Sequence, residues 1–200
     1  AVVFVHLLGA LVVLVSGAVQ LLPLVRRRWP RVHRWNGRAY LAAAVTASMA
    51  GLYMVWITGS VGDLAQHLAI TLNALLIFAC AALALHAARA RRFDVHRRWA
   101  LRLFLVASGV WFFRIGLMLW IIVNRGPAGF DQETFSGPAL TLLAFGQFVL
   151  PLAVAEIYFR AARQRGAVVK YAATMILAIG GVVTIAGIGA AAMILWLPRL

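Results

Sequence analysis

Six apolar runs constrain this chain more than any other feature of its sequence. A helix needs about 20 apolar residues to cross a hydrocarbon core of ~30 Å, and each run is about that long or longer. Hydrophobic residues make up 64% of the chain, well above the roughly 45–50% that is usual for soluble domains. The sequence therefore predicts an all-α polytopic membrane protein with one six-helix transmembrane domain over residues 1–200. The predicted spans are Ala1–Val25, Arg38–Gly59, Leu64–Ala88, Trp99–Val123, Ser136–Arg160 and Ala167–Leu197.

The first run is longer than the apolar part of a signal peptide and does not end in a small-residue cleavage pattern, so we expect a retained membrane helix. The chain carries 19 Lys and Arg but only five acids, a net charge of +14. Because these charges lie between membrane spans, their expected partner is a bilayer with anionic head groups and not nucleic acid. Other membrane subunits are further expected partners.

The positions of the basic residues predict the orientation. Only Arg125 and Arg199 fall in regions expected on the outer side. The positive-inside rule therefore places the first, third and fifth connectors in the cytoplasm and both termini outside, in the inner membrane of a bacterium. The three connectors hold Arg26, Arg27, Arg28, Arg31, Arg34 and Arg38; Arg89, Arg91, Arg92, Arg97, Arg98 and Arg102; and Arg160, Arg163, Arg165 and Lys170.

The second and fourth spans are preceded by related motifs. The first motif reads H-R-W-N-G-R-A-Y from His33 to Tyr40, and the second reads H-R-R-W-A-L-R from His96 to Arg102. Pro30 can begin a short helical turn that Asn36-Gly37 would end, so we expect residues 32–36 at the interface and a span that begins near Arg38.

These motifs resemble those of an uncharacterised family of predicted bacterial membrane proteins, whose members show H-R-x-x-G-R-x-Y and later H-R-R-W-x-x-R. The resemblance extends over about Leu7 to Arg160 and includes Gly17, Gln20 and Glu156. The family's usual methionine after the second tryptophan is Ala100 here. The resemblance implies a helical membrane domain and brings no established activity.

The two motifs predict a basic pocket at the inner leaflet. Arg98 and Arg102 are four residues apart and share a helix face. A pocket of arginines and imidazoles can hold a phosphate or carboxylate, with Glu156 at the same level as counter-charge. Alternatively, the arginines only set the orientation and contact lipid head groups. The residues of the predicted pocket are His33, Arg34, Arg38, His96, Arg97, Arg98, Arg102 and Glu156.

Arg114 lies inside the fourth predicted span, ~14 Å from its outer boundary. An arginine there costs about 2.5–3.5 kcal/mol on insertion scales and usually faces a bundle interior or a wet cavity. By depth, its expected neighbours are Asn73, Gln147 and Ser48. Since Arg114 follows His96 by five helical turns, both side chains are expected on one face of the bundle.

His6 and His67 lie at matching predicted depths near the outer boundary. Two imidazoles on facing helices can ligate a haem iron, and an arginine can pair with a propionate. The inner histidines His33, His86 and His96 offer the same chemistry. Alternatively, all five are interface residues.

The sequence contains no hydrolase triad, zinc motif, P-loop or dinucleotide fingerprint, which argues against an enzyme. It favours a binding or scaffold protein, either an accessory subunit of a membrane assembly or a binder of an amphiphile such as a lipid or quinone. A transmembrane protein with haem b is the second interpretation. A small-molecule transporter is the third, because no predicted span is broken at mid-depth.

Overall fold

The computed structural model describes residues 2–164 and 166–197, and these residues form helices joined by short connectors. Five helices are long and apolar enough to cross a membrane, or six spans if α5 and α6 count as one. The chain is thus an all-α polytopic membrane protein, as predicted. The elements are α1 (Val2–Leu21), α2 (Pro23–Arg28), α3 (Pro30–Tyr53), its π-helical continuation η1 (Met54–Gly59), α4 (Leu64–Arg89), α5 (Phe93–Ala107), α6 (Gly109–Asn124), α7 (Pro138–Ala161), α8 (Ala167–Ala191) and η2 (Ala192–Trp196).

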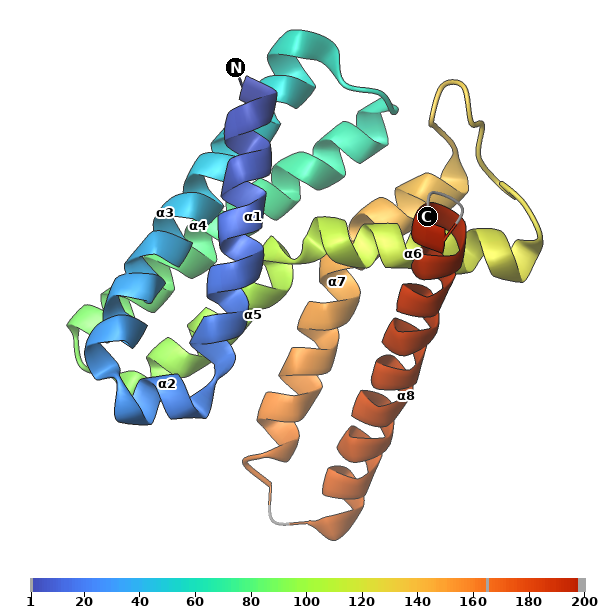
Figure 1. Cartoon of the computed structure of the whole chain (residues 1–200). Coiled ribbons are helices and arrows are strands. Elements are labelled where there is room, and N and C mark those ends of the chain that lie inside the picture. The colour runs from blue at the N-terminus through green and yellow to red at the C-terminus, as the bar shows by residue number, and fades with distance from the viewer. Residues whose placement is uncertain (1, 165, 198–200) are drawn as a thin grey trace. The chain divides into compact units, whose positions relative to one another are not determined.

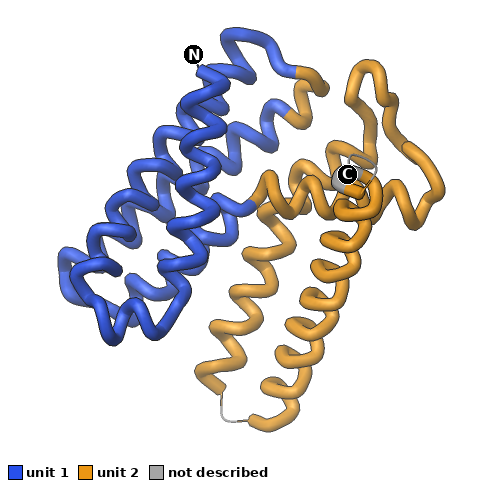
Figure 2. The backbone as a smooth tube through the Cα atoms, viewed as in Figure 1, with its two compact units in different colours: residues 1–60, 67–108 blue, residues 61–66, 109–200 orange. Residues whose placement is uncertain are grey.

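The chain divides into two compact units (Figure 2). Unit 1 comprises residues 1–60 and 67–108, and unit 2 comprises residues 61–66 and 109–200. The expectation of one six-helix domain stays a prediction.

One predicted boundary is wrong, and one predicted span is bent. The predicted break at Asn36-Gly37 does not exist, because α3 runs without interruption from Pro30 and the Asn36 side chain donates to the Ser16 carbonyl of α1 instead of ending a turn. The span predicted over 99–123 is interrupted at Ser108, and its halves belong to different units. The argument that His96 and Arg114 share one helix face therefore has no support. The argument against a transporter from unbroken spans also fails.

In unit 1, α1 packs closely against α3 (Figure 1). The short helix α2 connects these two helices at one end. Small residues allow this approach: a Cβ at Gly9 would lie 2.9 Å from the Cβ of Ala47. The His6 Nδ1 lies 2.9 Å from the Ala47 carbonyl oxygen, in hydrogen-bonding distance. The interior face of α3 consists of Tyr40 and a row of Ala and Gly, all buried.

In unit 2, α6 crosses α7 and α8 (Figure 1). A Cβ at Gly187 of α8 would lie 3.0 Å from the Ile115 carbonyl oxygen of α6, so this crossing also depends on a glycine. The buried core of the crossing consists of Ile115, Leu117, Met118, Leu140, Ala190 and Ala191.

The connector between α6 and α7 is held by the Asp131 carboxylate. Its Oδ1 accepts hydrogen bonds from the backbone N–H groups of Glu133 and Thr134, both at 2.8 Å, and from the Thr134 hydroxyl. The backbone N–H of Thr134 is the main reason that the pKa of Asp131 lies below its ordinary value of 3.8. Since this carboxylate is exposed and outside the spans, its titration is accessible to experiment.

We expect acidification to release this connector. A lowered folded-state pKa means that the contribution of Asp131 is fully present above 3.8 and is lost as the pH falls through the lowered value. In NMR spectra of the protein in micelles, the amide proton of Thr134 should shift with this titration. Asp131→Asn should remove the titration, whereas Glu133→Gln should retain it. A Thr134 shift that is the same in Asp131→Asn and in the unchanged protein would contradict the assignment.

Candidate functional site

The two basic motifs adopt the same local geometry at the starts of α3 and α5. The Arg38 guanidinium lies 4.7 Å from the ring centroid of Trp35, and the Arg102 guanidinium lies 4.7 Å from that of Trp99. Each pair joins a tryptophan to the arginine three residues later, one turn along the helix. The pair on α3 is exposed, whereas the pair on α5 is half-buried. The motif similarity seen in the sequence is thus a repeated structural element.

One face of α3 carries the arginines of its motif into an apolar stripe. Arg34, Arg38, Leu41, Val45 and Met49 follow one another at intervals of four, three, four and four residues, which places them along one side of a helix. Arg34 and Arg38 are exposed. This side of α3 therefore changes from basic to apolar along its length.

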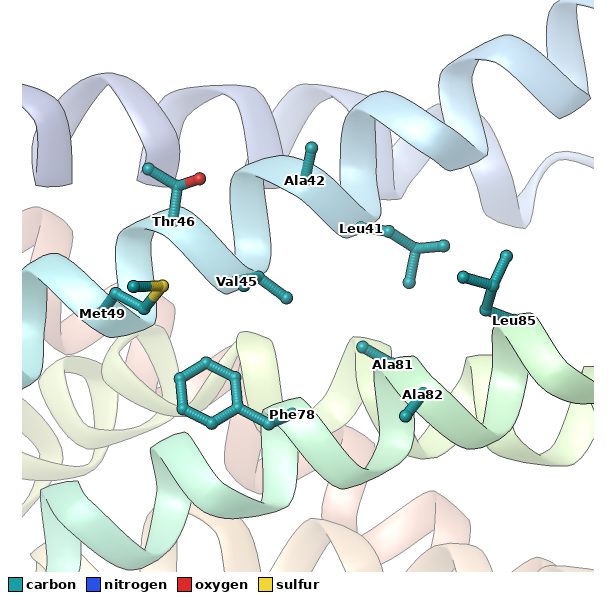
Figure 3. A pocket seen from close by; sticks show the side chains of 9 residues that line it. All are labelled: Leu41, Ala42, Val45, Thr46, Met49, Phe78, Ala81, Ala82 and Leu85. Carbon is teal, nitrogen blue, oxygen red and sulfur yellow. The ribbon is translucent and has the colours of Figure 1, made fainter.

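The apolar part of this stripe lines a groove between α3 and α4 (Figure 3). Its volume is about 670 Å³, within the range of small-molecule sites. Across the groove, Arg89 follows Leu85 of α4 by four residues, so it lies on the same helix face. The lining residues are Leu41, Ala42, Val45, Thr46, Met49, Phe78, Ala81, Ala82 and Leu85.

The basic rim of this groove, defined as Arg34, Arg38 and Arg89, is open to solvent. Across the part of the chain that the structure describes, these three guanidinium groups form no ion pair. Their positive charge is thus not neutralised within unit 1.

A different face of α3 turns toward α1 and carries His33, Gly37 and Tyr40. The Gln20 side chain of α1 donates from Nε2 to the His33 carbonyl oxygen at 3.0 Å. A Cβ at Gly37 would lie 2.5 Å from that Nε2, so glycine makes room for the contact. Three buried polar atoms here have no hydrogen-bond partner: Gln20 Oε1, His33 Nδ1 and Tyr40 Oη.

His96 of α5 is held by a contact with α4. The His96 Nδ1 is 2.9 Å from the Ala84 carbonyl oxygen of α4. Because a carbonyl can only accept, this nitrogen carries the proton and Nε2 is the free ring nitrogen. The histidines of the two motifs lie in the same unit.

Of the predicted pair of outer histidines, His6 contacts α3 and His67 contacts η1. His6 lies against Ala47, whereas the His67 ring packs edge-on against Trp56 with centroids 5.9 Å apart. The His6 ring also lies close to Gly51, where a Cβ would be 3.5 Å from His6 Cε1, so Gly51 and Trp56, the nearer contacts of the two histidines, are five residues apart. On α4, His67 Nε2 and Asn73 Oδ1 are buried without a hydrogen-bond partner. Haem ligation by His6 and His67 stays a prediction.

The other arginines of the second motif differ in exposure. Arg97 is exposed, whereas Arg98 and Arg102 are half-buried. All three residues lie on α5, so the predicted helical spacing of Arg98 and Arg102 is present.

The remaining predicted residues lie in unit 2, apart from Asn73. Gln147 is buried and donates from Nε2 to the Ala144 carbonyl within α7, and its Oε1 is unpaired. Arg114 is exposed on α6 and makes no hydrogen bond with any residue that the structure describes. The predicted polar cluster of Arg114 with Gln147 is therefore not formed. Glu156 is half-buried on α7.

Sequence reasoning missed the groove, the role of Gln20 and the unpaired Tyr40 hydroxyl. The groove has a weak signal, because the four-residue spacing of Arg34 and Arg38 continues into Leu41 and Val45. The Gln20 contact has no local signal, since it joins residues 13 apart. Among the described residues, no group of three or more His, Cys, Asp or Glu side chains is placed to hold a metal ion.

No curated protein and no solved structure matches the chain. A family described as a predicted membrane protein, DUF2306, matches residues 3–159, a region that contains both histidine–arginine motifs and the whole groove. The chain therefore belongs to the DUF2306 family of predicted membrane proteins.

Proposed function

We propose that unit 1 binds an amphiphile with an anionic head group, its hydrocarbon chain in the groove between α3 and α4 and its head group at the basic rim. The observation that carries this proposal is the continuity of the arginine stripe with the lining of the groove on one face of α3. The rim would lie at the cytoplasmic face of a bacterial inner membrane, where the positive-inside rule puts these arginines.

The head group supplies most of the selectivity in this proposal. Hydrocarbon chains of the bilayer are as apolar as the groove, so burying one there gains packing but little hydrophobic free energy. Each arginine near an anionic surface contributes about 1 kcal/mol. Guanidinium groups also form paired hydrogen bonds with phosphate or carboxylate oxygens. The rim should therefore favour anionic lipids over zwitterionic ones, and over a quinone, whose head group is neutral.

The stacking of Arg38 on Trp35 supports the same assignment. A tryptophan at the membrane boundary holds its helix at the level of the lipid head groups. The contact at 4.7 Å fixes the Arg38 guanidinium over this ring. It thus keeps the charge at the depth where the head group of a groove-bound lipid would lie.

Neutralising the rim should weaken this binding. Replacing Arg34 and Arg38 by Gln removes two contributions of about 1 kcal/mol each, which is about 30-fold in affinity. The measurement is native mass spectrometry of the protein from nanodiscs that contain equal amounts of phosphatidylglycerol and phosphatidylcholine. The unchanged protein should retain phosphatidylglycerol, and the double variant should lose the preference. Added oleate distinguishes a carboxylate from a phosphate head group.

Two controls separate a site from general surface charge. Arg160→Gln with Arg163→Gln makes the same change of charge on exposed residues of unit 2 and should leave the preference intact. Ala42→Phe with Ala82→Phe fills the groove without a change of charge and should abolish retention, whereas Ala178→Phe on an exposed part of α8 should not. Equal lipid retention by the groove-filled and unchanged proteins would disprove the proposal.

A further inference from the structure

In unit 2, the contacts of α6 gather at one end of the helix pair α7 and α8. The core that α6 shares with α7 includes Leu140, two residues after α7 begins at Pro138. On α8, the contacts of α6 lie at Gly187 and Ala190, close to the end of that helix at Ala191. The helix α6 therefore crosses its two neighbours near these ends (Figure 1).

The lengths of α7 and α8 give the depth of this crossing. Leu140 precedes Arg160 by 20 residues, ~30 Å along a helix, which is the thickness of the hydrocarbon core. On α8, Gly187 follows Lys170 by 17 residues, ~26 Å. By the positive-inside rule, Arg160 and Lys170 mark the inner ends of these two helices. The crossing with α6 therefore lies at the outer edge of the hydrocarbon core.

The connector between α6 and α7 gives the same depth independently. The Phe113 ring of α6 packs against the Phe135 ring of this connector, with centroids 6.4 Å apart. Seven residues further along α6, the Trp120 Nε1 donates to the Ala128 carbonyl oxygen at 2.8 Å. Two turns of α6 thus run beside the connector. Because irregular backbone does not lie exposed in hydrocarbon, these turns belong to the membrane surface.

Arg114 directly follows Phe113 and lies at this depth. Its side chain is exposed, as are those of Val110 and Trp111, which precede it by one helical turn. An arginine is costly in hydrocarbon but not among lipid head groups, and tryptophan is enriched at the membrane boundary. The exposed side of α6 thus has the composition of a helix that lies in the interface.

The chemistry of the Arg114 side chain selects its partner. Its guanidinium forms no hydrogen bond with any residue that the structure describes, and it cannot lose its proton. The phosphate groups of phospholipids are anions that occur at the depth of the head groups. A guanidinium binds such a group through two parallel hydrogen bonds.

We propose that α6 lies along the outer surface of the bilayer and that Arg114 binds the phosphate of an outer-leaflet phospholipid. Trp111 lies one turn away, at the boundary of the hydrocarbon core. This surface belongs to unit 2 and to the outer leaflet, so it does not depend on the groove or on its basic rim.

The first test measures whether α6 lies flat. Val110→Cys and Ile122→Cys are made separately on a Cys80→Ala background, and spin labels on them report their depth in liposomes by electron paramagnetic resonance. Both positions are exposed and lie 12 residues apart, ~18 Å along the helix. Both labels should lie at the head groups, whereas a label on Ala178→Cys, near the middle of α8, should lie deep. The proposal is overturned if the two depths on α6 differ by more than half of the length between them.

The second test measures the contact with phosphate. Lys170 is the only lysine of the sequence, so Arg114→Lys with Lys170→Gln leaves one ammonium side chain, which keeps the charge on α6. Solid-state NMR in phospholipid bilayers then measures the dipolar coupling between its labelled nitrogen and lipid phosphorus, in a buffer without phosphate. We expect a clear coupling. In a galactolipid bilayer with added inorganic phosphate we expect none, which separates a lipid from free phosphate.

The matched control is Gln132→Lys with Lys170→Gln. Gln132 is exposed in the turn of the connector that the bridge between Asp131 and Ser136 closes. An ammonium there should show little coupling, because this turn projects into water. No coupling at position 114, equal coupling at positions 114 and 132, or coupling to inorganic phosphate in the galactolipid bilayer would each overturn the proposal.

Discussion

Replacing Gly9 by leucine is expected to destabilise unit 1 by about 3 kcal/mol, the upper part of the range for overpacked cores. A Cβ at this position already lies 2.9 Å from the Ala47 Cβ and 3.4 Å from the Ala43 carbonyl oxygen. Because these neighbours are a short side chain and the backbone of α3, neither can turn away. The two helices must separate, which also breaks the contact of His6 with Ala47.

Thermal unfolding in detergent, followed by circular dichroism, measures this effect. The matched control is Gly180→Leu on α8, where a Cβ meets no atom within 4 Å. This control should unfold within a few degrees of the unchanged protein. Equal unfolding temperatures for Gly9→Leu and the unchanged protein would mean that α1 and α3 do not pack as described.

Gly137→Ala should release the connector between α6 and α7 at a cost of about 2–3 kcal/mol. Gly137 has φ 135° and ψ 167°, a region that is essentially restricted to glycine and costs other residues about 1–3 kcal/mol. A Cβ would also lie 2.7 Å from the Gly129 carbonyl oxygen and 2.8 Å from the Phe130 Cα. Both are backbone atoms, so the start of α7 must shift.

Gly166→Ala is the matched control, since Gly166 precedes α8 as Gly137 precedes α7. Its φ is −65° and a Cβ there meets no atom within 4 Å. Amide exchange followed by mass spectrometry should show faster exchange over 125–140 in Gly137→Ala only. If both variants exchange equally over this segment, the proposed backbone strain at Gly137 is refuted.

The membrane spans were predictable because the length and hydropathy of a single segment are enough to indicate that it crosses a bilayer. A segment inside a bilayer must satisfy its backbone hydrogen bonds internally, so a long apolar run almost has to be a helix. The break at Ser108 was missed because the sequence around it, Val106-Ala107-Ser108-Gly109, is as apolar and small as many unbroken helices. Because the break was missed, the prediction that Arg114 shares a helix face with His96 was made on a helix that does not continue.

The site could be predicted only in part. The motifs named His33, Arg34, Arg38 and His96. The structure exposes the two arginines at the rim of the groove, whereas His33 lies on the half-buried side of α3 toward α1 and His96 contacts α4. No local pattern states that division, because it depends on which side of α3 meets α1.

The sequence by itself determined that this chain is a helical membrane protein and where most of its spans lie, because hydropathy and length act within one segment at a time. Only the tertiary structure decided that Gly9 and Ala47 meet, that His96 is anchored by Ala84, and that α3 and α4 leave a groove between them. The physical reason is that helices in a membrane associate through packing of small residues and a few hydrogen bonds between distant parts of the chain, for which hydropathy gives no signal.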